Sequence, residues 1–231
     1  SVIHADETVI QVLKEKDRKP EQKSYMWCFG RDGDLPIIIF NYYDNRSNRA
    51  ARDLLSDFKG VLVCDGYKAY DSVQRTLDLT LSGCFAHCRR KFYLAEKDAK
   101  KSLKGKVKIL ASEALALIRK LYKNEKEIAD KPPDEKLKAR TNNSKPIVEE
   151  LKEWLKINET IVLPKSLTGK AISYALRQWD KLTRFCDDGR VPIDNNFMER
   201  HIRPFVIGRN NWLFSATTAG AAASAALYSI I

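Results

Sequence analysis

Alternation of apolar and polar residues dominates the first third of the chain and predicts β-strands. Residues 1–13 alternate with a period of two and place His4, Asp6 and Thr8 on the same side as Ile10. Four shorter runs also favour strands. The predicted strands cover residues 1–13, 25–30, 37–43, 61–64 and 80–85. The fourth is wholly apolar, which is typical of a strand buried on both faces. Turn residues between the second and third predict a hairpin.

Helical periodicity of the apolar positions predicts helices between these strands. It also predicts helices in most of the chain that follows the fifth strand. One helix is predicted to end at Phe58, with Ser47 or Asn48 as its N-cap, and a second covers residues 86–99. Helical spacing then continues almost throughout residues 103–179. Its breaks fall at residues 130–133, 142–146 and 162–164. This block predicts three or four helices, and the Ala-rich tail of the chain predicts a further packing helix.

One more predicted helix carries a polar face. Asp194, after Pro192, is a good N-cap, and Pro204 disfavours helical geometry at Arg203, so the helix is about nine residues long. At 100° per residue, two amides, an acid and two cations share one side. They are Asn195, Asn196, Glu199, Arg200 and Arg203. A lone Glu on a helix is usually a solvated surface residue, but these neighbours, with Arg209 beyond them, suit a carboxylate held near a phosphate.

Composition and charge narrow the class of protein. Hydrophobic residues make up 44% of the 231 residues, enough for a real core. The net charge of +11 suggests an acidic partner, of which nucleic acid is the commonest. Residues 87–126 hold 13 Lys and Arg against 4 Asp and Glu, so the charge is concentrated there. The basic run from Lys97 to Lys108 is most often a solvated helix face, with non-specific phosphate contact as the alternative.

Cysteines and apolar runs exclude other classes of protein. The five scattered cysteines indicate free thiols in a reducing cytoplasm. Cys84 and Cys88 flank His87 at a spacing that does not favour zinc, and no second pair follows. No signal peptide is visible, and residues 219–231 are too few to span a bilayer. The chain opens inside a strand-like run and ends without a cap, so we expect it to come from a longer protein.

Three acids stand at positions that suit one chemistry. Asp6 lies in the first strand, Asp65 follows the buried fourth strand, and Glu199 lies on the later helix. Three converging carboxylates can hold two divalent metal ions, and hard oxygen ligands favour magnesium or manganese. Glu7 competes with Asp6, since adjacent strand residues face opposite ways. Beside Gly66, Asp65 alone is equally consistent with a turn acid.

Four motifs covering nearly the whole chain carry a family resemblance. They are HADET at 4–8, CDGYKAYD at 64–71, GCFAHCRRKF at 83–92 and PIDNNFMERHIRPFVIGRNNWLFS at 192–215. They resemble the catalytic part of bacterial transposases of the insertion-sequence sixty-six family, which has a DDE catalytic core. The resemblance implies an α/β, ribonuclease H-like fold. A mixed five-stranded sheet with flanking helices would be interrupted by an α-helical insertion before the Glu-bearing helix. The implied parts are 1–98 and 188–231 for the core and 99–187 for the insertion.

The resemblance also implies the site. The family's catalytic acids map onto Asp6, Asp65 and Glu199, which would bind Mg²⁺, with Mn²⁺ as a substitute. Residues expected to contact DNA are His87, Arg89, Arg90, Lys91, Asn195, Asn196, Arg200, Arg203, Arg209 and Trp212. Taken alone, His87 would be a structural histidine and Trp212 a core residue. The implied partners are transposon ends and target DNA, further copies of the chain in the active complex, and other subunits of the same element. The implied location is the bacterial cytoplasm, on chromosomal or plasmid DNA, without a membrane.

Three functions are therefore weighed. The leading one is a DDE transposase catalytic domain, which cleaves transposon ends and joins the exposed 3′-hydroxyl to target DNA. The second is a structure-selective nuclease of the same fold that stops after hydrolysis. The third is a DNA-binding or assembly module whose acids no longer bind metal.

Overall fold

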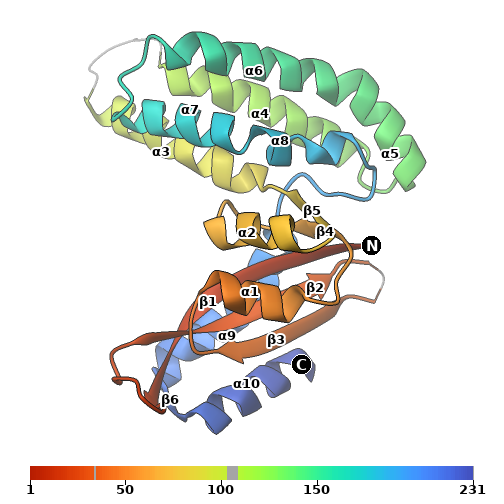
Figure 1. The fold of residues 1–231 in the computed structure, drawn as a ribbon. Coiled ribbons are helices and arrows are strands. Elements are labelled where there is room, and N and C mark those ends of the chain that lie inside the picture. The colour runs from red at the N-terminus through yellow and green to blue at the C-terminus, as the bar shows by residue number, and fades with distance from the viewer. Residues whose placement is uncertain (34, 103–108, 231) are drawn as a thin grey trace. The chain divides into compact units, whose positions relative to one another are not determined.

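A computed structural model describes residues 1–33, 35–102 and 109–230 of the chain (Figure 1). The chain forms two compact units. Unit 1 consists of Ser1–Leu81 and Asn195–Ile231, and unit 2 of Ser82–Asp194. The domain boundaries expected from the sequence, after residues 98 and 187, remain a prediction about how the family is organised.

Unit 1 is built on a mixed sheet. Its five main strands are β1 (Val2–Lys14), β2 (Lys23–Arg31), β3 (Ile37–Tyr43), β4 (Gly60–Val63) and β5 (Leu79–Ser82). Their order is β3-β2-β1-β4-β5, the ribonuclease H-like order that was predicted. β1 pairs antiparallel with β2 and parallel with β4, and β2 and β3 form the predicted antiparallel hairpin. Asp34, in the hairpin turn, lies outside the described residues. All five predicted strands are confirmed. The fifth is shorter than expected, because the next helix already begins at Phe85.

Helices cover both faces of this sheet (Figure 1). They are α1 (Asn48–Leu55), α2 (Lys68–Thr76), α9 (Asn196–Trp212) and α10 (Thr218–Ile230). Trp27 and Phe29 of β2 pack in one core with residues of α1 and α2. Met26 and Cys28, on the other face of the same strand, pack with α9 and α10. A three-residue strand, β6 (Ser215–Thr217), pairs with β1 and was too short to predict.

Helix α9 corrects the prediction for the Glu-bearing segment. It begins at Asn196, with Asn195 at the cap position, and runs through Pro204 to Trp212 instead of ending near Arg203. A proline inside a helix costs about 3 kcal/mol, because it removes a hydrogen bond and crowds the preceding turn. The residue after it, Phe205, is fully buried and packs against Phe40, Trp212 and Tyr228. Burial of this ring outweighs the local preference.

The predicted N-cap residue, Asp194, has a partner within unit 2. The carboxylate of Asp194 accepts a hydrogen bond from the Tyr122 hydroxyl at 2.8 Å within unit 2. This hydrogen bond attaches Asp194 to α4.

Unit 2 is helical. Its helices are α3 (Phe85–Ser102), α4 (Leu110–Glu127), α5 (Pro133–Ala139), α6 (Lys145–Glu159), α7 (Leu167–Arg177) and α8 (Trp179–Leu182), with a 3₁₀ turn at Arg184–Cys186. α3 packs against α4 and α7, and α6 packs against the same two helices (Figure 1). Part of the predicted helical block, residues 103–108, lies outside the described residues.

One predicted break in unit 2 is wrong. The segment 142–146 does not interrupt the helix, because a π-helical turn, Arg140–Ser144, joins α5 to α6. Pro146 falls in the first turn of α6, where its missing N–H costs nothing. The buried Arg140 guanidinium pairs with Glu125 and donates to three backbone carbonyls in residues 185–191. That buried cation fixes the unusual turn.

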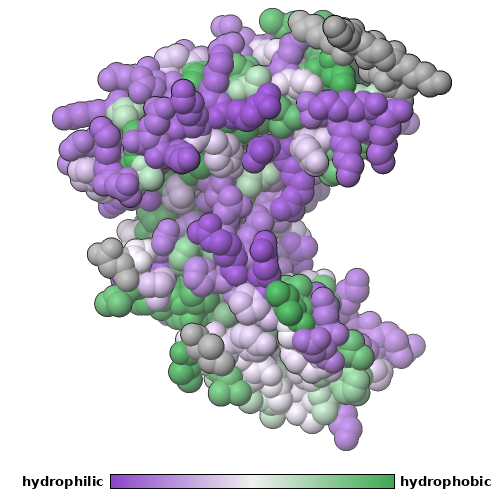
Figure 2. Space-filling model, turned by 180° about the vertical axis from the view of Figure 1, so that it is seen from behind, coloured by the Kyte–Doolittle hydropathy of each residue, from purple (hydrophilic) through white to green (hydrophobic). Residues whose placement is uncertain are grey.

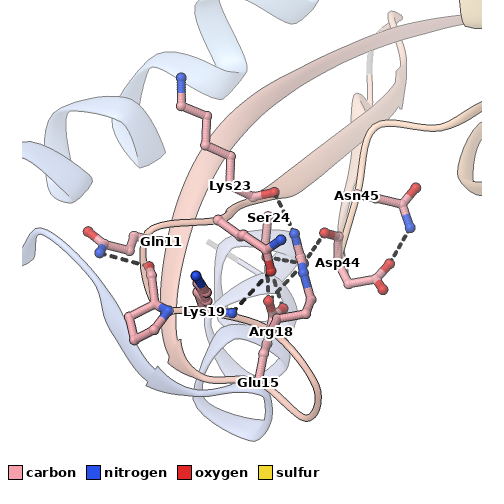
Figure 3. A network of polar contacts seen from close by, with 10 residues as sticks. Gln11, Glu15, Arg18, Lys19, Lys23, Ser24, Asp44 and Asn45 are labelled. Carbon is pink, nitrogen blue, oxygen red and sulfur yellow. Dashed lines mark hydrogen bonds and ion pairs between the residues drawn. The ribbon is translucent and has the colours of Figure 1, made fainter.

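The connection between β1 and β2 is held by a polar network (Figure 3). Arg18 donates to Glu15 at 2.7 Å, to Ser24 at 2.8 Å and to the Asp44 carbonyl. Ser24 donates in turn to the Glu15 carboxylate at 2.9 Å. The Glu15 side chain is only 4% exposed, so its charge needs these partners. The network ties the β1–β2 turn to the end of β3.

The cysteines and the apolar helices bear on two further predictions from the sequence. All five cysteines are buried and free, as predicted. Among the described residues, no helix combines the length and apolar character that crossing a bilayer requires.

The outer edge of β3 is covered by α10. The Phe40 backbone N–H donates to the Ser229 hydroxyl at 2.8 Å, and that hydroxyl donates to the Ala225 carbonyl at 2.8 Å. An uncovered edge strand offers unpaired N–H groups to other chains. Ser229 therefore both docks α10 and protects the edge.

We predict that Ser229→Ala lowers the free energy of unfolding by about 1 kcal/mol, because it leaves the Phe40 N–H without its partner. Urea unfolding measures the change. Ser224→Ala on the same helix is the matched control, since it makes the same change in helix propensity. Equal stabilities of the two variants would contradict a role for the Ser229 hydroxyl.

Candidate active site

Two adjacent acids of β1 face opposite sides of the sheet. Asp6 pairs with Cys28 and Glu7 with Trp27, and directly paired residues share a face. Cys28 belongs to the core under α9 and α10, whereas Trp27 belongs to the core under α1 and α2. Asp6 therefore points to the side of the sheet covered by α9, the helix that carries Glu199.

Glu7 has its charge compensated on its own side. Its carboxylate accepts a hydrogen bond from the Tyr70 hydroxyl at 2.6 Å and forms an ion pair with Arg46. The Arg46 guanidinium also stacks on the Tyr67 ring, with 3.6 Å to the centroid. Burial raises the pKa of Glu7, and the bonds from Tyr70 and Arg46 oppose that rise. Its partners make Glu7 a structural acid.

Asp65 lies beside Asp6 because of the strand register. β1 and β4 are parallel, and His4 pairs with Val63. β4 ends at Val63, and Asp65 lies in the turn that follows, two residues beyond the last paired position. One Asp65 carboxylate oxygen accepts the Tyr67 backbone N–H at 2.8 Å, which fixes the turn after β4.

Glu199 lies in the first turn of α9, and α9 packs on β1 and β2. A glycine permits this close packing. A Cβ atom at Gly30 would lie 2.8 Å from Met198 Cε and 2.7 Å from Ile38 Cδ1, both too close. Because Gly30 pairs with His4, the gap it leaves is two residues along β1 from Asp6. Acids in a first turn are also favoured by the helix dipole.

The electrostatics of Asp6 show that acidic groups gather around it. Burial, together with the negative charges of Glu7, Asp65 and Glu199, raises the pKa of Asp6 to about 7, against a hydrogen bond from the Glu7 backbone N–H. Without a cation, this cluster repels itself. The donor set, three carboxylates contributed by β1, the turn after β4 and helix α9, fits a hard divalent cation such as Mg²⁺.

A buried hydrogen-bonded link joins the strand of Asp6 to the helix of Glu199. The Asn195 side-chain N–H₂ donates to the Ala5 carbonyl at 2.8 Å, and its oxygen lies 2.8 Å from His4 Nδ1. This orientation of the amide requires His4 Nδ1 to carry the proton. His4 and Asn195 are 2% and 1% exposed, and Phe197 packs on the imidazole at 4.9 Å. The link fixes the start of α9 against β1.

Comparison with known proteins now decides the family. The profile of the Transposase IS66 family matches residues 1–223. The chain belongs to this family. Its members are DDE transposases, and a transposase acts on DNA.

Curated relatives cover this domain and more. The chain is 32% identical to the uncharacterized protein y4qI of Sinorhizobium fredii over 94% of its own length and 41% of the relative's. It is 31% identical to y4jD of the same organism, over 99% of its length and 46% of the relative's. The chain thus spans less than half of each relative. No solved structure matches it.

The DNA-contact residues predicted on α9 of the transposase domain differ in their surroundings. Arg200 and Arg203 are exposed, and Asn196 is half-buried. Arg209 instead donates to Thr8 Oγ1 at 2.8 Å and to a neighbouring carbonyl of β1. Trp212 is half-buried and packs on Phe205, with ring centroids 5.5 Å apart. The two exposed arginines keep their side chains available to a ligand. Arg209 and Asn195 have theirs bonded to β1.

The predicted contact residues of the 83–92 motif all lie on α3 in unit 2. His87 is half-buried, while Arg89, Arg90 and Lys91 are exposed. The Arg89 guanidinium lies 5.8 Å from the Tyr122 ring centroid, and Lys91 Nζ lies 4.6 Å from that of Tyr174. Their role in contacting DNA stays a prediction.

Sequence reasoning missed the residues that support the acids. Arg46 and Tyr70, which hold Glu7, gave no local signal, because they lie 39 and 63 residues away from it. His4 did give one, since it shares the strand face of Asp6. The Asn195 amide was predicted to face a ligand, and its burial depends on β1, 190 residues earlier.

We predict that metal-free protein loses stability as the pH rises from about 4 to 7. The pKa of Asp6 in the folded state, about 7, exceeds the unfolded value. The folded state therefore binds more protons in that window, and ionising Asp6 costs up to about 4 kcal/mol. Asp6→Asn should flatten this dependence in urea unfolding with EDTA at pH 5 and 7.5. The raised pKa of Glu7 acts in the same direction and remains in the variant.

The control for this pH profile is Asp57→Asn, an exposed acid of unit 1, which should keep the wild-type slope. If the free energy of unfolding of Asp6→Asn depended on pH as that of the wild type does, Asp6 would not be the acid with the raised pKa.

A second prediction concerns the buried amide. Asn195→Ala should lower the free energy of unfolding by about 2–4 kcal/mol, because the Ala5 carbonyl and His4 Nδ1 both lose a buried partner. Asn211→Ala, an exposed position on the same helix, should change it by less than about 0.5 kcal/mol. Denaturant titration compares them. Equal losses would mean that the link does not hold α9.

Proposed function

We propose that this domain is the catalytic core of a transposase that cuts the phosphodiester bonds at transposon ends and joins the exposed 3′-hydroxyl to target DNA. Asp6, Asp65 and Glu199 are the proposed catalytic residues. The observation that supports the proposal is that Asp6 faces the side of the sheet covered by α9, the helix of Glu199, while Asp65 directly follows β4, the parallel neighbour of β1.

The proposed cofactor is Mg²⁺, with Mn²⁺ as a substitute. When bound, it supplies a polarised phosphate and an activated attacking oxygen. Asp6 would provide oxygen ligands from β1, Asp65 from the turn after β4, and Glu199 from α9 over the same face of the sheet. Glu7, paired with Arg46, is kept out of the ligand set.

DNA contact is assigned to the cations closest in sequence to the acids. The exposed Arg200 and Arg203 on α9 are proposed to neutralise the scissile strand, and His87, Arg89 and Lys91 on α3 to contact flanking DNA. The active complex is proposed to contain several copies of the chain, with other subunits of the element, and to act on chromosomal or plasmid DNA in the bacterial cytoplasm.

Two alternatives make different demands on the acids. A nuclease would use the same three residues and differ only in its products. An assembly module would not need the three acids. Burying their negative charges without a compensating cation would only destabilise such a module. The position of Asp6 on the sheet face covered by the helix of Glu199 therefore favours an enzyme over a module.

The test of the proposed site is calorimetric titration of the 231-residue chain with Mn²⁺. Asp65→Asn removes a ligand while keeping the side-chain shape. It should weaken binding by at least about tenfold, the lower end of the effect of losing even an outer-shell partner. It should also abolish Mg²⁺-dependent nicking of supercoiled DNA.

The exposed acid Asp57, changed to Asn, is the matched control and should leave both readings unchanged. Undiminished Mn²⁺ binding by Asp65→Asn would overturn the metal assignment. Joined donor–target products, assayed with the full-length protein on DNA carrying the element's ends, separate a transposase from a nuclease.

A further inference from the structure

The charge of the chain belongs almost entirely to unit 2. Unit 2 contains 26 Lys and Arg against 16 Asp and Glu, which leaves a net charge of +10. Unit 1, of similar length, contains 15 against 14 and is nearly neutral. The proposed catalytic acids all lie in the nearly neutral unit. Long-range attraction for a polyanion is therefore a property of the helical unit.

Within unit 2, acids and bases are not evenly mixed. Several bases in the segment from α4 to the start of α6 form ion pairs. The pairs are Lys120–Glu150, Lys131–Glu135, Arg140–Glu125 and Lys145–Asp187. Helix α7 is different, because it contains Lys170 and Arg177 but no acid, and the chain has no acid from residue 160 to residue 179. Neither base forms an ion pair with any residue that the structure describes.

The bases of α7 share one face with an aromatic residue. At 100° per residue, Lys170, Tyr174 and Arg177 fall within an arc of about 60°. Both bases are exposed and Tyr174 is half-buried. From the adjacent α3, the exposed Lys91 places its Nζ 4.6 Å from the Tyr174 ring centroid. These four residues are called the α7 strip below.

The dimensions of the α7 strip suit a nucleic-acid backbone. Lys170 and Arg177 are separated by about 10 Å along the helix axis, at 1.5 Å per residue. Duplex DNA presents one negative charge per ~1.7 Å of axis, so a strip of this length faces several phosphates. Figure 2 shows hydrophilic side chains gathered over the helical unit on the face that it displays.

We infer that the α7 strip binds the phosphate backbone of duplex DNA, and that the helical unit supplies much of the sequence-independent affinity of the domain. Lys91, Lys170 and Arg177 neutralise phosphates, and the Tyr174 ring holds the Lys91 ammonium in place. The assignment rests on the proposed function only in naming DNA as the polyanion. It gives the helical unit a task separate from catalysis, that of retaining DNA.

The experiment measures binding of the full chain to a labelled duplex of about 30 base pairs and arbitrary sequence, long enough to cover several phosphates on each strand. Binding is measured in EDTA at several salt concentrations. The Lys170→Gln/Arg177→Gln variant should reduce the slope of log K against log salt by about 2, because each phosphate that the protein no longer neutralises lowers the slope by ~0.9. Its weakening should be the same for duplexes of different sequence, because backbone contacts do not read bases.

The matched control removes the same charge from another exposed helix face of unit 2, by Lys152→Gln/Lys156→Gln on α6, where acids are interspersed. Its slope should stay close to that of the wild type. Equal slopes for both double variants would show that only net charge matters, and an unchanged slope for the α7 variant would also overturn the inference. If the wild-type chain does not bind the duplex at low salt, the strip serves an acidic protein surface instead, and the inference fails.

Failure here and failure of the proposed function are distinguishable. The α7 variant leaves the acids of unit 1 untouched, so its Mn²⁺ titration should match that of the wild type. Normal DNA binding by the α7 variant with normal Mn²⁺ binding would reject the strip alone. A reduced salt slope in the α7 variant, with no Mn²⁺ binding by the wild type, would reject the catalytic proposal alone.

Discussion

Mutual repulsion between the carboxylates around β1 is the physical constraint on which the structure of unit 1 depends. β1 carries two adjacent acids in the middle of a sheet, where burial raises the pKa of both. On one face, Arg46 and Tyr70 compensate Glu7. Asp6 faces the other side, and burial and the negative charges of Glu7, Asp65 and Glu199 raise its pKa. Ionising such a cluster at neutral pH costs free energy, of which a stably folded protein has only about 5–15 kcal/mol to lose.

Several non-local features fix the segments that carry the three proposed catalytic acids. β4, which ends two residues before Asp65, pairs in parallel with the start of β1. The Asn195 amide fixes the first turn of α9 to β1, and Gly30 lets Met198 approach the sheet. Beyond Pro204, the buried ring of Phe205 keeps the rest of α9 on the same face. Each feature acts on the spacing between the acids without being an acid itself, which is how a scaffold makes a site from distant residues.

The sequence predicted what depends on local pattern. Period-two alternation and turn chemistry located the strands, and the resemblance supplied their order and the three acids. Prediction from the sequence failed where contacts with distant residues determine the local structure. Pro204 ends a helix by local rules, yet Phe205 has its packing partners on β3 and α10. The residues 142–146 contain every local sign of a break, yet the buried Arg140 has partners 15 to 51 residues away. Asn195 looked like a ligand-facing amide because nothing nearby shows that β1 buries it.

The central claim is that Asp6, Asp65 and Glu199 form one cation site. A crystal of the chain soaked with Mn²⁺ and measured at the manganese absorption edge tests it most directly. The account predicts anomalous density within about 2.2 Å of a carboxylate oxygen of each of the three acids, close to the distances of small divalent cations. Density bound by other residues, or Glu199 turned away from a metal held by Asp6 and Asp65, would contradict it.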